Sequence, residues 1–179
     1  QYKLLRFSTQ LFSLNEDSQK LYNTRLKNRT KTNPADIIYI VILFELHKIS
    51  EMDSHLVILK KYYLDKILDG SKPVELRLLK AAFAPFGAIA IGDRLFLKQS
   101  SGPVCAVAKV SSFQEFSNLT PHKIAQLKAI YNHLVLGDDE YWKEKSDSKF
   151  AVFVWLKNVI TIDPIKICKK DWRAWVVLN

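Results

Sequence analysis

The 179-residue chain has little of what marks disulfide-rich and membrane proteins. It contains two cysteines, Cys105 and Cys168, and neither belongs to a C-x-x-C pair. A disulfide framework is therefore not expected, and a reducing compartment is the default expectation. The longest apolar run, Ile37 to Phe44, is much shorter than the roughly 20 residues that a membrane-spanning helix requires. These absences predict a cytoplasmic protein with no membrane partner.

The motifs of several enzyme classes are also missing. The sequence has no G-x-S-x-G, G-x-x-x-x-G-K-[ST] or G-x-G-x-x-G pattern, which disfavours serine-hydrolase, P-loop and Rossmann chemistry. Its four histidines, His47, His55, His122 and His133, include no pair four residues apart. A zinc site is therefore not expected. We predict neither a metal nor any other cofactor.

Glycine and tryptophan are distributed unevenly. All five glycines and all four tryptophans follow residue 52, and the only methionine is Met52. Residues 15–34 are polar and rich in asparagine and basic side chains, a composition typical of weakly structured chain. We therefore predict an N-terminal extension of unknown role over residues 1–51, separate from the native domain. A single domain is expected over residues 52–179.

Positive charge exceeds negative charge along the whole chain. Lys and Arg total 27 against 18 Asp and Glu, a formal net charge of +9. Such a surplus favours an anionic partner, of which nucleic acid is the commonest. The plainer interpretation is an ordinary basic protein, because net charge reports on partners and not on fold.

Short strand and helix patterns alternate beyond Met52. Apolar and β-branched stretches predict strands at 55–59, 74–79, 94–98, 104–110, 150–162, 165–168 and 175–178. Helices are expected over 62–68, before the C-cap position Gly70, after the capping pair Thr120-Pro121, and over 138–145. This succession predicts an α+β domain, a small mixed β-barrel with two or three helices packed around it.

Three aromatic or helical features carry packing predictions. The apolar face of the helix after Pro121 should comprise Ile124, Leu127, Ile130, Tyr131 and Leu134. Trp175 is expected in the core, because tryptophan is usually mostly buried. Trp142 could form the wall of a cleft, although a packing role is favoured.

The most informative stretch is Gly70-Ser71-Lys72-Pro73-Val74-Glu75-Leu76-Arg77. Alternate side chains of a strand point to opposite faces, so Val74, Leu76 and Leu78 should enter the core while Glu75 and Arg77 share the other face. A carboxylate between Lys72 and Arg77 stays ionised and orients both cations. The guanidinium can then offer a planar fork to a phosphate, a carboxylate or a base edge. The alternative is a surface Glu–Arg pair on an edge strand, which would contribute little.

This stretch resembles the G-x-K-x-x-E-x-R pattern of the ASCH family, in the same place between the first helix and the second strand. The resemblance continues through residues 92–98 and 172–176 and covers residues 52–179. It implies a PUA-like barrel whose cleft, between barrel and helix, receives RNA or a modified base.

Pattern and resemblance together predict a ligand site. The expected ligand-binding residues are Lys72, Glu75, Arg77, Lys98, Ser100, Ser101, Trp172 and Arg173. Positions 98–101 end a strand and open a turn, where ligand contacts are common, although turn residues need no function. Lys169 and Lys170 are expected to form a nucleic-acid surface, because cations and aromatic rings alternate around them.

Several functions remain open at this stage. The first is a binding module that takes RNA or a nucleotide-like ligand in a basic cleft. The second is a metal-independent hydrolase, an amidohydrolase or ribonuclease acting on a modified nucleoside or RNA, with Lys72 and Glu75 as catalytic residues. One ASCH branch resembles an amidohydrolase that deacetylates acetylated cytidine with a lysine and a threonine of this motif; this chain has Glu75 in place of that threonine. A third is a regulatory or structural protein whose cleft has lost its ligand. The sequence determines neither the ligand nor the oligomeric state.

Overall fold

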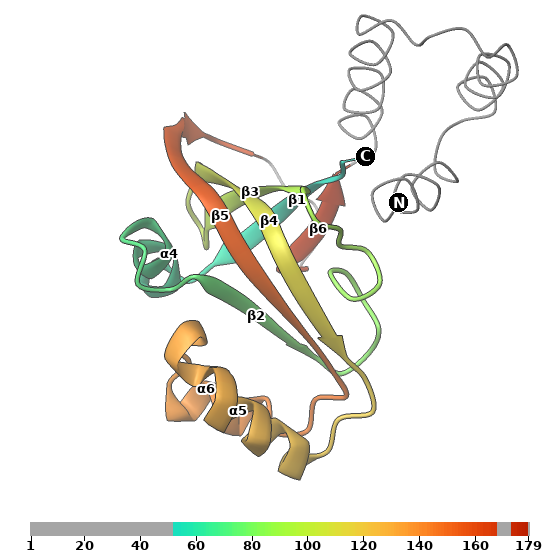
Figure 1. Cartoon of the computed structure of the whole chain (residues 1–179). Coiled ribbons are helices and arrows are strands. Elements are labelled where there is room, and N and C mark those ends of the chain that lie inside the picture. The colour runs from blue at the N-terminus through green and yellow to red at the C-terminus, as the bar shows by residue number, and fades with distance from the viewer. Residues whose placement is uncertain (1–51, 168–172, 179) are drawn as a thin grey trace, which may run out of the picture. The chain divides into compact units, whose positions relative to one another are not determined.

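Six strands form one curled sheet, a half-barrel, in the computed structural model, which describes residues 52–167 and 173–178 (Figure 1). The strands are β1 (Ser54–Leu59), β2 (Val74–Leu79), β3 (Arg94–Gln99), β4 (Val104–Phe116), β5 (Phe150–Ile165) and β6 (Trp175–Leu178). Their order in the sheet is β2-β5-β4-β3-β1-β6. Only the β1–β3 pair is parallel among these described strands, so the sheet is mixed.

Three helices accompany the sheet: α4 (Lys61–Leu68), α5 (Pro121–Val135) and α6 (Asp139–Glu144). Helix α4 contacts β1, β3 and β5, while α5 packs beside β2. Figure 1 shows α5 and α6 together below β2, and α4 beside the end at which β2 begins. The predicted α+β class, a mixed barrel-like sheet with helices packed around it, is confirmed. No helix among the described residues is long and apolar enough to span a membrane.

Local sequence signals explain where the helices begin and end. The Thr120 hydroxyl accepts a hydrogen bond from the Lys123 backbone N–H at 3.3 Å and caps α5. The Asp138 carboxylate likewise accepts from the Tyr141 N–H at 2.6 Å and caps α6. Each cap satisfies one of the free N–H groups of a helix N-terminus.

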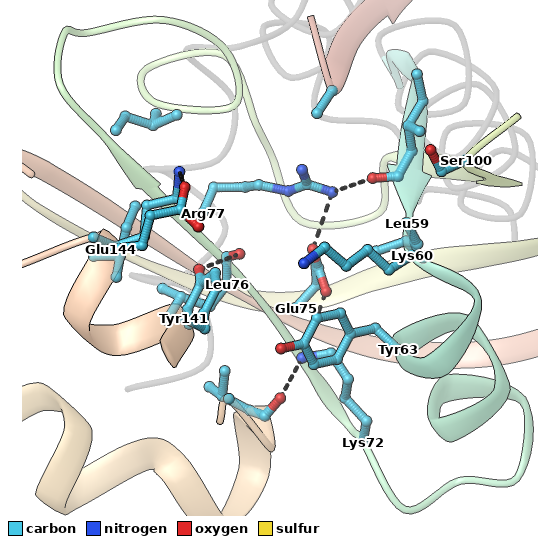
Figure 2. Close-up of a pocket in the computed structure, with 17 residues that line it drawn as sticks. Leu59, Lys60, Tyr63, Lys72, Glu75, Leu76, Arg77, Ser100, Tyr141 and Glu144 are labelled. Carbon is cyan, nitrogen blue, oxygen red and sulfur yellow. Dashed lines mark hydrogen bonds and ion pairs between the residues drawn. The ribbon is translucent and has the colours of Figure 1, made fainter. Parts of the chain in front are cut away.

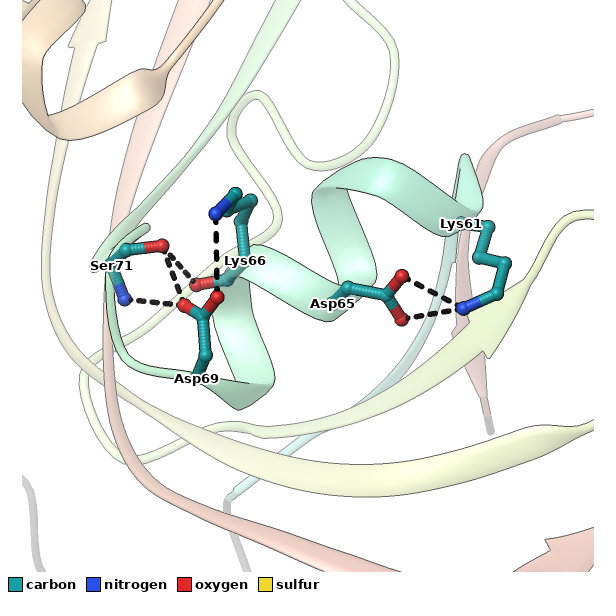
Figure 3. Close-up of polar contacts among 5 residues, drawn as sticks. All are labelled: Lys61, Asp65, Lys66, Asp69 and Ser71. Atoms are coloured by element: carbon teal, nitrogen blue, oxygen red, sulfur yellow. Dashed lines mark hydrogen bonds and ion pairs between the residues drawn. The ribbon is translucent and has the colours of Figure 1, made fainter.

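The end of α4 leads directly into the motif stretch at residues 70–77. Gly70 has a φ of +80°, a left-handed conformation that suits glycine. The Ser71 N–H and hydroxyl both donate to Asp69 Oδ1, at 2.9 Å and 2.5 Å (Figure 3). The Lys72 N–H returns to the Lys66 carbonyl at 2.8 Å. These bonds hold the turn that delivers Lys72 to the start of β2.

The sheet separates two apolar clusters, and the two faces of β2 point toward different clusters. Val74, Leu76 and Leu78 lie in the cluster covered by α5, as the alternation predicted. The opposite face of the sheet packs a second cluster that includes Val152 and Val154 of β5. Because Glu75 pairs with Val154 and Arg77 with Val152 in register, Glu75 and Arg77 are on this second face.

Two sequence predictions are wrong. The strand expected at 165–168 does not form in its described part, because Ile165 ends β5 and residues 166–167 are in no element; Cys168 is outside the described residues. Ile130 is 57% exposed instead of packed. It lies six residues after Ile124, roughly 120° away around a helix of 3.6 residues per turn, and so at the margin of the buried face.

Candidate functional site

A cavity of about 410 Å³ lies among β1, the start of α4, β2 and α6 (Figure 2). Its volume is within the usual range for small-molecule sites, roughly 300–1,000 Å³. The polar side chains that line it are Lys60, Tyr63, Lys72, Glu75, Arg77, Ser100, Tyr141, Glu144 and Lys145. The motif trio predicted from the sequence is therefore part of a cavity wall.

Glu75 is the centre of the trio. Its Oε1 lies 3.0 Å from Arg77 Nη2 and its Oε2 lies 3.5 Å from Lys72 Nζ. Glu75 is only 6% exposed and Lys72 only 3% exposed. The alternative of a surface ion pair is therefore wrong, and the pairing takes place where water screens the charges weakly.

Lys72 is tied to the protein in several directions. Its ammonium donates to the Val74 carbonyl at 2.7 Å and to the Val135 carbonyl at 2.6 Å, and lies 5.3 Å from the centre of the Tyr63 ring. Val135 ends α5, where the helix leaves carbonyls without helical partners and carries partial negative charge. Burial lowers the pKa of Lys72, and the nearby Glu75 carboxylate opposes that shift. Lys72 thus joins β2 to the end of α5.

Arg77 is held by several contacts but keeps one hydrogen-bond donor without a partner among the described residues. Its Nη2 donates to Glu75 and to the Ile58 carbonyl, both at 3.0 Å, and its guanidinium lies 5.4 Å from the centre of the Trp175 ring. Its Nε is buried and has no hydrogen-bond partner among the described residues. The side chain is 15% exposed, so it reaches the cavity. Figure 2 shows the guanidinium extending between Glu75 and the carbonyl of β1.

The rim of the cavity adds further charges. Lys60 precedes α4 and is exposed, and Lys145 follows α6 and pairs with Glu144 at 2.9 Å. Together with Lys72 and Arg77 there are four cationic side chains in the lining, against two carboxylates, Glu75 and Glu144. The lining therefore carries an excess of positive charge, which favours an anionic or electron-rich ligand.

Two tyrosines complete the wall near the trio. The Tyr141 hydroxyl donates to the Leu76 carbonyl at 3.4 Å. Burial raises the pKa of Tyr141 and of Tyr63, so both remain neutral phenols at physiological pH. No sequence pattern indicated Tyr141, whereas Trp142 was a candidate for the wall. Trp142 is 4% exposed and donates to Asn132 Oδ1 at 2.8 Å, so its predicted packing role is confirmed.

The other predicted ligand residues are distributed unevenly around the cavity. Ser100 lines it, and Arg173 precedes the lining residue Ala174. Lys98 and Ser101 are not among the lining residues, and Lys98 Nζ donates to the Gln99 carbonyl at 3.2 Å. Trp172, Lys169 and Lys170 lie outside the described residues, so their roles stay predictions. Trp175 is 3% exposed, as its predicted core position requires, and it also covers Arg77.

Lys60 and the α6 residues Tyr141 and Glu144 were not found from the sequence. Lys60 had one local signal, its position immediately after an apolar strand, where strand ends often carry ligand contacts. The two α6 residues belong to a helix whose place beside β2 depends on the tertiary fold. No periodicity in the sequence indicates that contact.

Comparison with solved structures identifies similar folds. A serine-to-alanine variant of the ASCH protein from Zymomonas mobilis matches with a TM-score of 0.56 and 14% identity, over 70% of this chain and 88% of that chain. The Zymomonas mobilis ASCH protein itself matches with a TM-score of 0.55 and 14% identity, over 70% and 87% of the two chains. No protein-family model matches the sequence, and no curated protein does. The likeness therefore concerns the fold, and the described domain has the PUA-like fold of ASCH proteins.

Proposed function

We propose that residues 52–179 form a binding module that takes RNA or a nucleotide-like ligand in the cavity, with Arg77 as the principal contact. The observation that carries this proposal is the state of the Arg77 guanidinium. Glu75, the Ile58 carbonyl and the Trp175 ring hold it, and the side chain is still 15% exposed where it lines the cavity. A preorganised planar donor in a cavity suits a phosphate or the edge of a base.

The remaining lining residues support the same ligand chemistry. Lys60 and Lys145 lie at the rim, where a phosphate group of a nucleotide could be neutralised. Tyr63 presents an aromatic ring that a base could contact. Lys72 and Glu75 hold Arg77 in place and support the cavity wall, because their polar atoms are already engaged with the protein.

The test is affinity for nucleoside 5′-monophosphates and for a mixed-sequence RNA hexamer, measured by calorimetry on the full chain. Arg77→Lys keeps the charge and removes the planar fork. Loss of one charge-assisted hydrogen bond typically costs about 1.5–3 kcal/mol, so affinity should fall roughly tenfold to a hundredfold. Arg94→Lys is the matched control, because Arg94 is exposed on β3 and outside the cavity lining. If both variants bind as the parent does, Arg77 is not the contact and the proposal fails.

A second candidate, a metal-independent hydrolase of a modified nucleoside or RNA, rests on one observation. Burial lowers the pKa of Lys72, which lies beside the Glu75 carboxylate in a cavity of nucleoside size. A lysine with a lowered pKa can serve as a base or nucleophile. Against this role, Lys72 Nζ already donates to two carbonyls and faces Glu75.

Chromatography separates the two candidates. The full chain is incubated with an acetylated cytidine and, separately, with the RNA hexamer, and the products are followed over time. Product formation by the parent that disappears in Lys72→Met, in a preparation of the variant that circular dichroism shows to be folded, would establish the hydrolase. Binding of either compound without product formation would support the binding module and exclude hydrolysis of these two compounds.

A further inference from the structure

Asp93, His55 and Trp175 form a buried chain of hydrogen bonds, here called the relay. His55 of β1 has no exposed surface, and its Nε2 lies 3.0 Å from Asp93 Oδ2, whose side chain is 2% exposed. On the other side, the Trp175 Nε1–H of β6 donates to His55 Nδ1 at 3.1 Å. The relay therefore runs from Asp93, just before β3, through β1 to β6. Nothing in the sequence indicated that these three residues contact one another.

The chemistry of the indole determines the state of the histidine. An indole N–H can only donate, so His55 Nδ1 must accept. His55 is then the neutral tautomer with its proton on Nε2, which donates to Asp93. Asp93 is itself fixed, because its Oδ2 accepts from the Ala90 N–H at 2.7 Å and its Oδ1 from the Asp53 N–H at 3.1 Å. Each member of the relay therefore has one orientation that satisfies its hydrogen bonds.

The far end of the relay reaches Arg77. The Trp175 ring lies 5.4 Å from the guanidinium carbon, within the range of a cation–π contact. Glu75 and the Ile58 carbonyl hold Nη2 through hydrogen bonds, whereas the ring contacts the guanidinium through its π-system. The two hydrogen bonds hold the guanidinium at Nη2, and the ring contacts the group from a different direction. His55 in turn fixes the ring.

We propose that Trp175, oriented by His55 and Asp93, is the positioning residue that sets the orientation of the Arg77 guanidinium toward the ligand. The inference rests on the proposed function, because it concerns the residue assigned there to contact the ligand. Backbone pairing already joins β6 to β1 without the indole N–H. The strands pair along Ser54 to Val57, and the Ile58 N–H donates to the Ala174 carbonyl at 2.9 Å. The hydrogen bond to His55 is therefore available for orienting the ring.

The variant that tests the relay is Trp175→Phe, which keeps an aromatic ring and removes the N–H. Trp142→Phe is the matched control: Trp142 is also buried and also donates its N–H, to Asn132 Oδ1 at 2.8 Å, but it is not among the residues that line the cavity. Affinity for the RNA hexamer should fall roughly threefold to thirtyfold in Trp175→Phe and stay at the parent value in Trp142→Phe. Equal affinities in the two variants would overturn the proposal.

Nuclear magnetic resonance of the ligand-free chain makes the test independent of the proposed function. The Arg77 Nε–H resonance should shift in Trp175→Phe and stay in place in Trp142→Phe. The ¹⁵N shifts of His55 in the parent should report the Nε2–H tautomer, a measurement that stands even if Trp175→Phe does not fold. An Nδ1–H tautomer, or an unmoved Arg77 resonance, would refute the relay. If the parent binds neither probe while these resonances behave as expected, the proposed function fails and the relay remains.

Discussion

Replacing Lys72 by methionine tests whether this lysine supports the cavity wall. Methionine keeps an unbranched apolar stem of similar length and removes the ammonium. Three interactions are then lost: the bonds to the Val74 and Val135 carbonyls at 2.7 Å and 2.6 Å, and the pairing with Glu75 at 3.5 Å. The last carbonyl of α5 loses its partner, and Glu75 retains only Arg77 as a counter-charge.

The magnitude follows from the burial of these groups. Removing one partner of a buried, hydrogen-bonded charge typically costs about 3–5 kcal/mol, because the groups left behind are neither paired nor solvated. We expect Lys72→Met to lower the free energy of unfolding by this amount. Domains of ordinary stability have about 5–15 kcal/mol in total, so the variant should be strongly weakened. Urea denaturation with an unchanged m-value would measure the loss.

Lys66→Met is the matched control on the same helix-and-turn segment. Lys66 is partly exposed and pairs with Asp69 at 3.5 Å on the surface of α4 (Figure 3). A surface pair of this kind contributes about 0–1 kcal/mol, so the control should unfold nearly as the parent does. If Lys72→Met also stays within about 1 kcal/mol of the parent, Lys72 does not join β2 to α5, and its role as a support of the wall is refuted.

The remaining predictions concern pH, the trio, the chain boundary and the C-terminal cations. Because burial lowers the pKa of Lys72 below 10.5, the unfolded chain binds more protons than the folded protein between that lowered value and 10.5. Stability of the parent relative to Lys72→Met should therefore rise with pH across this window, and a flat difference in urea titrations would contradict the shift. Glu75→Gln should lower both melting temperature and RNA affinity, since two cations lose their shared counter-charge; an unchanged melting temperature would show that the trio does not stabilise the fold. A chain beginning at Met52 should melt cooperatively in calorimetry, and insolubility would place residues 1–51 in the core. Replacing Lys169 and Lys170 by alanine should reduce the salt dependence of RNA binding by about one or two phosphate contacts, and an unchanged slope would remove them from the surface.

Much of the local structure follows from the sequence by itself. The alternation in Val74 to Leu79 assigned the two faces of β2 correctly, because side-chain direction in a strand has a period of two wherever the strand lies. Gly70, Thr120 and Asp138 marked helix boundaries, because a left-handed φ or a capping oxygen is a property of a few neighbouring residues. The trio of Lys72, Glu75 and Arg77 was predictable for the same reason, since its members are within six residues.

Only the tertiary structure decided which distant groups complete the site. Lys72 reaches Val135, 63 positions away, and Trp175 meets His55 at a separation of 120. These meetings depend on the sheet order β2-β5-β4-β3-β1-β6 and on α5 packing beside β2, neither of which is encoded in any short window. The same dependence explains why Tyr141 and not Trp142 lines the cavity: both are on α6, and only the direction from which β2 approaches the helix distinguishes them. Local patterns assign the faces of an element, whereas long-range packing determines what each face meets.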